Sequence, residues 1–381
     1  MKNYNKLAFL NVLRIMLAIG IVLWHYSYGF DSYIEGNTAN NIFAYLKQLT
    51  RYGGNQAFML LAGMSFYIAY YKKLSSGELS MKDFAKKRAK RIYPFAILSV
   101  LSVYFLNVFL KVKYDADTDI LLIHLLEDTL FFGSRLFGNA YGIFNGPIWF
   151  LSALLVAYLI SCFIIAVTRK HQSIYWFLIP LIACFLIGNG STTIVLILNL
   201  GSVGNELFNF FLGFWFMIFL YKFDNFNKYL KLVIRILGII ISFTYIIVYY
   251  KCFNKGVDCY FGINEVAGSI MVWIPLITAL YGLKFNIIFD NKTFKFISSL
   301  SFYFYVWHAP IMSYVRSFNT YNNLGFEESG VKNFIIYFLI ILIVSILSYL
   351  TNFGVSKLIK YIKNKKQTTN ENNIETLETN N

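Results

Sequence analysis

Charged residues are scarce in this chain. Asp, Glu, Lys and Arg make up only 14% of its 381 residues, and 57% are hydrophobic, whereas a soluble domain has about a quarter charged residues. The apolar residues stand in blocks that approach the ~20 residues needed to cross a bilayer core, such as LVIRILGIIISFTYIIVYY at 232–250. These blocks recur along the whole chain, which excludes a signal peptide followed by a soluble domain.

Cysteine and histidine are also rare, with four of each. The cysteines lack the spacing of a metal site, so we expect no metal. Cys162 and Cys184 fall in apolar blocks, where we expect core residues. Cys252 and Cys259 fall in a segment predicted to lie outside the cell, where disulfides form. The sequence leaves open whether these two pair.

The apolar blocks predict an all-α, polytopic integral membrane protein with about ten transmembrane helices, since backbone groups in lipid must pair within their own helix. We expect a multi-pass protein of the cell membrane with both termini in the cytoplasm. Residues 1–360 form the predicted transmembrane domain, and the polar residues 361–381 are predicted to be a disordered cytoplasmic tail. The predicted spans are 7–28, 53–71, 93–111, 146–168, 174–188, 205–221, 232–250, 264–283, 296–315 and 333–356.

The net charge of +15 comes from 34 basic and 19 acidic residues. With the N-terminus inside, the inside segments hold 23 Lys and Arg and the outside segments nine. This asymmetry is the positive-inside pattern, so the basic charge indicates membrane topology and contact with lipid rather than nucleic acid. The outside stretch 119–133, DILLIHLLEDTLFFG, has apolar residues at helical spacing. It is predicted to lie along the outer membrane surface.

Two ionisable residues, Arg14 and His25, stand inside the first predicted span. Arg in a span costs roughly 2.5–3.5 kcal/mol, so it needs a partner or a function. Eleven residues at ~100° each make about three turns, so both side chains share one face, ~16 Å apart along the axis. Asn11 and Ala18 continue this stripe, which is typical of a cavity wall. Alternatively, Arg14 pairs with an acid for packing and His25 reaches the outer headgroups.

His308 lies near the middle of the ninth predicted span, in SLSFYFYVWHAPI. Pro310 follows two residues later and removes a backbone donor, and such breaks in membrane helices typically line a cavity. The alternative is that His308 is a core residue whose hydrogen bonds are satisfied.

A dense group of cations, KKRAKRIYP at 86–94, precedes the third predicted span. One interpretation is topological, because basic residues hold a loop inside and contact anionic lipid. The other is a surface for a phosphate-rich ligand, since Arg binds phosphate through two parallel hydrogen bonds. The cations of this patch are Lys86, Lys87, Arg88, Lys90 and Arg91.

Five segments together resemble the membrane proteins of acyltransferase family 3. They are Arg14-x10-His25, the glycine-led block GGNQAFMLLAGMSFYIAY at 53–70, the Arg-x-x-Arg-Ile-x-Pro element at 88–94, GPIWFLSALLVAYL at 146–159 and SFYFYVWHAPI at 301–311. One departure is clear: many members carry a Glu shortly after the Trp of the fourth span, and this chain has Leu151 to Leu154 there.

The resemblance implies transfer of an acyl group, usually acetyl, from cytoplasmic acyl-CoA to a hydroxyl on a surface polysaccharide or lipid-linked sugar. No cofactor is implied beyond acyl-CoA as co-substrate. His25 would be the general base or would accept the acyl group itself, and Arg14 would hold the thioester or a phosphate. Arg88 and Arg91, with Lys87, would hold the CoA phosphates, and His308 would be a second acid/base or a positioning residue.

The competing interpretation is a polysaccharide or lipid-linked sugar exporter. In that case Arg14 and His308 would bind substrate or protons, as ionisable residues in transporter spans do.

Overall fold

The computed structural model describes residues 6–30, 54–130, 144–169, 173–189, 200–254, 268–325 and 330–378. Within these ranges every regular element is a helix, so the all-α prediction is confirmed for the described part of the chain. Cys259 lies outside these ranges and the side chain of Cys252 is not described, so their pairing stays open. Cys184 is buried, as expected of a core residue, and Cys162 is half-buried.

A helix lies in each of the ten predicted spans. These helices are α1 (Leu10–Phe30), α3 (Gly54–Phe66) with the π-helical η1 (Tyr67–Tyr71), α5 (Met81–Tyr114), α7 (Trp149–Thr168), α8 (Leu178–Asn189), α9 (Leu200–Phe223), α10 (Lys228–Asn254), η5 (Ser269–Trp273) with α12 (Ile274–Leu280), α14 (Lys292–Asn322) and α15 (Gly330–Glu378). Short elements join them: α4 (Lys72–Ser75), α6 (Leu122–Thr129), the 3-10 helices η2 (Gly146–Ile148) and η3 (Ile174–Phe177), and α13 (Asn286–Phe289).

Five of these helices are long and apolar enough to cross a membrane: α5, α7, α9, α10 and α15. Three shorter helical stretches are also apolar, at Leu10–Tyr26, Ile174–Leu186 and Ser269–Leu280. The helices therefore support a membrane protein, while ten crossings and cytoplasmic termini stay predictions.

Helices α3 and α9 cross in backbone contact. A Cβ atom built on Gly63 would lie 1.9 Å from the Phe210 carbonyl oxygen, and one on Gly213 would lie 2.0 Å from the Leu60 carbonyl oxygen. Small residues at a crossing let membrane helices approach this closely. Phe66 and Phe214 are fully buried beside the crossing, with ring centroids 6.4 Å apart. The two glycines therefore allow α3 and α9 to pack closely at the centre of the core.

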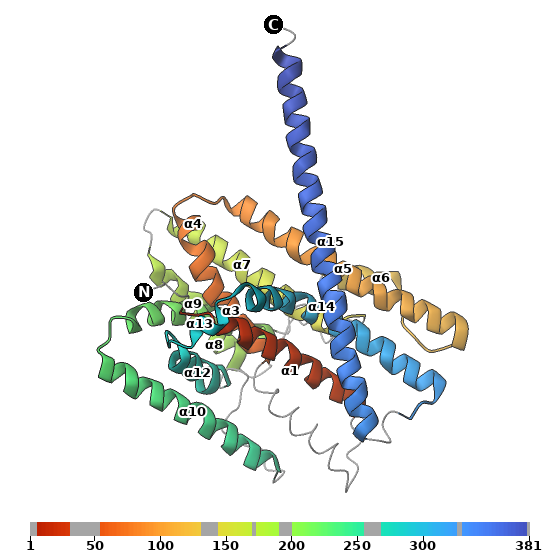
Figure 1. The fold of residues 1–381 in the computed structure, drawn as a ribbon, viewed down its shortest axis with the longest axis horizontal. Coiled ribbons are helices and arrows are strands. Elements are labelled where there is room, and N and C mark those ends of the chain that lie inside the picture. The colour runs from red at the N-terminus through yellow and green to blue at the C-terminus, as the bar shows by residue number, and fades with distance from the viewer. Residues whose placement is uncertain are drawn as a thin grey trace.

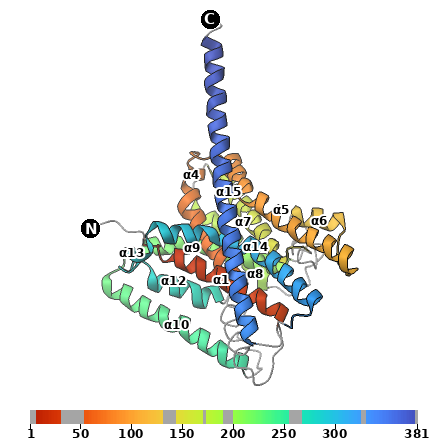
Figure 2. The ribbon, with the colours of Figure 1, turned by 45° about the vertical axis from the view of Figure 1, so that its right-hand side comes forward.

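Helix α1 lies between two flanks, with α10 and α12 on one side and α5 and α6 on the other (Figures 1 and 2). Hydrogen bonds fix it at both ends. Near its N-terminal end, the Phe9 backbone N–H donates to Asn286 Oδ1 at 2.9 Å. Near its C-terminal end, the Tyr26 hydroxyl donates to the Asn333 carbonyl of α15 at 3.0 Å. These contacts hold in place the helix that carries Arg14 and His25.

Helix α15 extends far beyond the other helices (Figures 1 and 2). It continues to Glu378, so residues 361–378 are helical where the sequence predicted disorder. Extending an existing helix avoids the unfavourable nucleation step, and the Lys, Gln and Glu residues of this segment have good helix propensity. Its polar composition alone did not reveal this.

The basic segment 72–91, expected as a loop, is mostly helical. Helix α5 begins after Ser80, whose side chain accepts from the Asp83 N–H at 3.0 Å and forms an N-cap. Pro94 therefore lies inside α5 and not at its start. It removes the helical donor to the Lys90 carbonyl. Arg88 and Arg91 are consequently fixed on one helix face, three residues apart.

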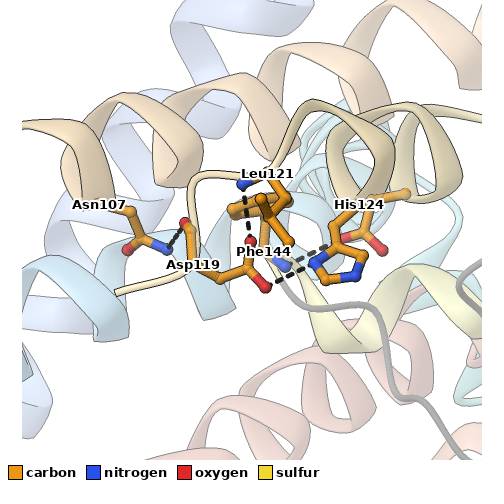
Figure 3. Close-up of polar contacts among 6 residues, drawn as sticks. Asn107, Asp119, Leu121, His124 and Phe144 are labelled. Atoms are coloured by element: carbon orange, nitrogen blue, oxygen red, sulfur yellow. Dashed lines mark hydrogen bonds and ion pairs between the residues drawn. The ribbon is translucent and has the colours of Figure 1, made fainter. Parts of the chain in front are cut away.

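The stretch predicted to lie on the outer surface forms the short helix α6. Apolar side chains are exposed along it: Leu122, Ile123 and Leu126. Asp119 anchors its start, accepting from the Leu121 N–H at 2.9 Å and pairing with His124 Nδ1 at 2.5 Å (Figure 3). An exposed apolar face of this kind suits a membrane surface, and the position in the membrane stays a prediction.

Candidate active site

Two histidines that the sequence placed in separate spans meet in the structure. The ring centroids of His25 on α1 and His308 on α14 are 4.9 Å apart, with the rings tilted by 48°. In the described residues no hydrogen bond reaches either nitrogen of His25. The two imidazoles are therefore close enough to act on one small chemical group.

The tautomer of His308 follows from its backbone contact. Its Nδ1 lies 2.5 Å from the Tyr305 carbonyl oxygen. A carbonyl oxygen only accepts, so Nδ1 carries the proton and, in the neutral ring, Nε2 presents a lone pair. His308 is 0% exposed, and within the described structure Nε2 has no partner. Among the described residues, the hydrogen bonding expected of a satisfied core residue is thus complete at Nδ1 and not at Nε2.

Two further buried polar atoms near His308 also lack partners among the described residues. They are Oδ1 of Asn145 and Nε1 of Trp307. An unsatisfied buried polar group costs about 1–3 kcal/mol, and native proteins contain few of them. Three around one turn of α14 indicate a place where a ligand with both donors and acceptors completes the hydrogen bonding.

Arg14 stands on the same helix as His25, closer to its N-terminal end. Its Nη2 donates to Ser65 Oγ at 3.0 Å, and Ser65 Oγ donates to the Leu61 carbonyl at 2.7 Å. No Asp or Glu in the described ranges forms an ion pair with Arg14. The alternative in which an acid neutralises Arg14 for packing therefore finds no support here.

Asn11, expected on the same stripe, has a packing contact. Its side-chain amide donates to the Phe289 carbonyl at 3.3 Å and so ties α1 to α13. Ala18 is buried, at 4% exposure. The polar stripe of α1 thus reduces to Arg14 and His25.

Arg14 belongs to a cluster of three arginines. It interacts electrostatically with Arg91, Arg88 does so with the same residue, and all three interact with the Tyr158 hydroxyl. The cluster joins α1, α5 and α7, which are distant in the sequence. Across the described ranges none of these guanidiniums forms an ion pair with a carboxylate. The result is a cationic site that its protein surroundings leave unneutralised.

The two arginines of α5 differ in their surroundings. Arg88 lies against aromatic rings, with its Cζ 4.4 Å from the centroid of Tyr70 and 5.6 Å from those of Phe84 and Tyr158, and it donates to the Tyr70 hydroxyl. These cation–π contacts orient it. Arg91 is exposed and accessible to an arriving ligand. Lys87 is exposed on α5.

The model of a protein family described as "Acyltransferase domain" matches residues 7–352. The chain belongs to acyltransferase family 3. This confirms the resemblance seen in the five segments, all of which lie inside the matched range, and it identifies the chain as an acyltransferase. No curated protein and no solved structure matches it.

This acyltransferase also has buried polar residues that the sequence analysis did not select. Glu206 and Asn209 of α9 are both 0% exposed, and Gln56 of α3 donates to Glu206 Oε1 at 3.4 Å. A polar side chain inside an apolar block was the available signal, since such residues are rare in spans and usually functional. Ser65 and Tyr158 carried the same signal. That Ser65 contacts Arg14 and Tyr158 contacts Arg88 was visible only in the folded chain.

Proposed function

We propose that this acyltransferase moves an acyl group, acetyl in the simplest case, from cytoplasmic acyl-CoA to a hydroxyl of a cell-surface or exopolysaccharide sugar or of its lipid-linked precursor. One observation carries the proposal. Helix α1 presents Arg14 to an unneutralised arginine cluster and His25 to the buried His308. The two ends suit the two substrates, an anionic thioester and a neutral polyol.

The arginine cluster supports a donor that carries phosphate groups. Guanidiniums bind phosphate through paired, charge-assisted hydrogen bonds. Arg91 is exposed and would contact the CoA phosphates first, while the aromatic contacts of Arg88 fix the direction of its donors. Lys87 on the same helix would add attraction without direct contact with the cluster.

The distance along α1 supports a role for Arg14 at the donor phosphates. Arg14 and His25 are ~16 Å apart along the helix axis, too far for both to touch one thioester carbonyl. The flexible arm of CoA joins its phosphates to its thioester and would bridge this distance. The arrangement therefore holds the nucleotide at the cluster and delivers the acyl group to the histidines.

The histidine pair supports general-base chemistry. His25 takes the proton of the acceptor hydroxyl as that oxygen attacks the thioester carbonyl. The C–S bond then breaks, and the imidazolium returns the proton to the departing CoA sulfur. The lone pair of His308 Nε2 accepts a neighbouring donor and holds the acceptor or the His25 ring in place. The unpaired groups of Asn145 and Trp307 suit a ligand with several hydroxyls.

The proposal places the protein in the cell membrane as a multi-pass enzyme with both termini in the cytoplasm. The arginine cluster then faces the cytoplasmic supply of acyl-CoA, and the histidine pair lies toward the outer face where surface glycan is built. Residues 1–360 form the catalytic domain, in contact with membrane lipid.

The test uses the full chain in lipid nanodiscs with acetyl-CoA labelled in its acetyl group, and lipid-linked saccharides or surface glycan as acceptors. His25→Ala should lower labelled transfer ~10²–10⁴-fold, the usual contribution of a general base, while acetyl-CoA binding is retained. His124→Ala is the matched control, because His124 of α6 pairs with Asp119, which precedes that helix, and the variant should transfer at the parent rate.

Full acylation by a well-folded His25→Ala protein would end the catalytic role of that residue. The exporter interpretation predicts a different result. Glycan would then cross the membrane of sealed vesicles without acquiring label, and acetyl-CoA would have no effect.

A further inference from the structure

Helix α14 has a backbone carbonyl that its own helix leaves without the usual donor. Pro310 lies inside α14 and has no N–H, so the carbonyl four residues earlier, Val306 O, loses its helical partner. Val306 is buried, at 1% exposure. Bulk water therefore does not reach this carbonyl, and a buried carbonyl is costly to leave unpaired.

The side chain of Asn145 supplies the missing donor. Its Nδ2 lies 3.3 Å from Val306 O and 2.8 Å from Ser99 Oγ. The orientation of the amide is fixed, because Val306 O only accepts and Ser99 Oγ already donates to the Ala96 carbonyl at 2.7 Å. Asn145 is itself buried, at 1% exposure. It therefore bridges α5 and α14 at one specific carbonyl.

The segment around Asn145 is held on both sides. Before it, the Phe144 N–H donates to Asp128 Oδ2 at 2.7 Å, which ties the segment to α6. After it, the Pro147 carbonyl accepts from the Tyr305 hydroxyl of α14. Tyr305 is also the residue whose carbonyl accepts from His308 Nδ1. The carbonyls of Tyr305 and Val306, which follow one another in the turn of α14 that leads to His308, thus each accept from a side chain.

We propose that Asn145 is a positioning residue for His308. It holds Val306 O in place of the N–H that Pro310 lacks, and so keeps the 305–308 turn in the geometry in which His308 donates from Nδ1 and presents Nε2 to the acceptor. The catalytic consequence rests on the proposed function, whereas the effect on the His308 tautomer does not.

The first experiment measures the tautomer directly. In protein labelled with 15N-histidine, only four histidines contribute, and His308→Asn identifies the signals of His308. In the parent we expect His308 to have Nε2 unprotonated. In Asn145→Ala we expect the His308 ring to be a mixture of both tautomers. Asn107→Ala is the matched control, since the Asn107 side chain donates to the Asp119 carbonyl at 3.0 Å and not to a carbonyl of α14. Its spectrum should match the parent.

The second experiment is a double-mutant cycle with Pro310→Ala, which restores an N–H at position 310. Asn145→Ala alone should lower kcat ~10–100-fold, because misplacement of a reacting group by about 1 Å has effects of this size. The KM for acetyl-CoA should stay within about twofold. In the Pro310→Ala background, Asn145→Ala should lower kcat much less, because Val306 O regains a helical donor.

Three results would overturn the proposal. One is a parent-like His308 spectrum in Asn145→Ala, and another is an equal loss of kcat in both backgrounds. The third concerns folding: if Asn145→Ala is not recovered as folded protein, the double variant with Pro310→Ala should be, and its failure would refute the compensation. If the parent transfers no acyl group, the proposed function fails, while the nitrogen spectra still decide the role of Asn145.

Discussion

A methyl group added at the α3–α9 crossing should disturb both stability and activity. In Gly63→Ala the new Cβ would lie 1.9 Å from the Phe210 carbonyl oxygen, whereas carbon and oxygen in close contact are ~3.3–3.6 Å apart. The helices must therefore separate by about 1.5 Å. Overpacking of this kind costs ~1–3 kcal/mol.

The separation also reaches the candidate site. Ser65 follows Gly63 by two residues and accepts from Arg14 at 3.0 Å, and a shift of about 1.5 Å would break that bond. A hydrogen bond to a charged group is worth ~1.5–3 kcal/mol, which corresponds to ~10- to 10²-fold in binding or rate. We therefore expect Gly63→Ala to unfold at a lower temperature and to transfer acyl groups ~10²-fold more slowly.

The assay compares the melting temperature of detergent-solubilised protein with its rate of labelled acetyl transfer. Gly354→Ala is the matched control, because among the described residues no atom outside its own stretch of helix lies within 4 Å of a Cβ built there. It should be neutral or slightly stabilising, as replacing a helical glycine by alanine usually is. A Gly63→Ala protein that melts and reacts like the parent would refute the close crossing.

Three further predictions concern charge and topology. Arg88→Ala combined with Arg91→Ala should raise the KM for acyl-CoA ~10-fold or more without loss of inserted protein, since each charge-assisted contact contributes ~1.5–3 kcal/mol; parent-like rates at limiting acyl-CoA would leave the cations only a topological role. Arg14→Lys should insert like the parent but use acyl-CoA poorly, because Lys lacks the planar guanidinium that forms two parallel hydrogen bonds. Kinetics with varied acyl-CoA would show this as a raised KM. Reporters placed at residue 120 and after residue 365 should read external and cytoplasmic, and an external C-terminus would contradict the ten-span topology.

The sequence predicted the helical class and supplied the residues of the candidate site, because both depend on local patterns. Periodicity placed Arg14 and His25 on one face of one helix, and rarity in an apolar block drew attention to His308. What periodicity does not contain is contact between distant segments. The pairing of His25 with His308 and the electrostatic interaction of three arginines with Tyr158 arise from packing of helices, and only the folded chain shows them.

Composition predicted the polar segments less well. The basic segment 72–91 and residues 361–378 are both rich in charge or amide groups, which favoured a loop and a disordered tail. Helix propensity and the Ser80 cap decide the first segment, and continuation of an existing helix decides the second. Asn145 escaped notice because its importance depends on a proline 165 positions away in the sequence.

The π-helical turn η1, which continues α3, changes the direction in which the following side chains point. A π turn contains one residue more than an α turn would, and each residue of an α-helix turns the chain by about 100°. Side chains before and after Tyr67–Tyr71 are thereby out of phase with a continuous α-helix. Ser65, before the turn, faces Arg14 of α1, and Tyr70, within it, faces Arg88 of α5. One short stretch of chain thus reaches two different neighbours, and loss of a single residue there would turn one of these faces away from its arginine.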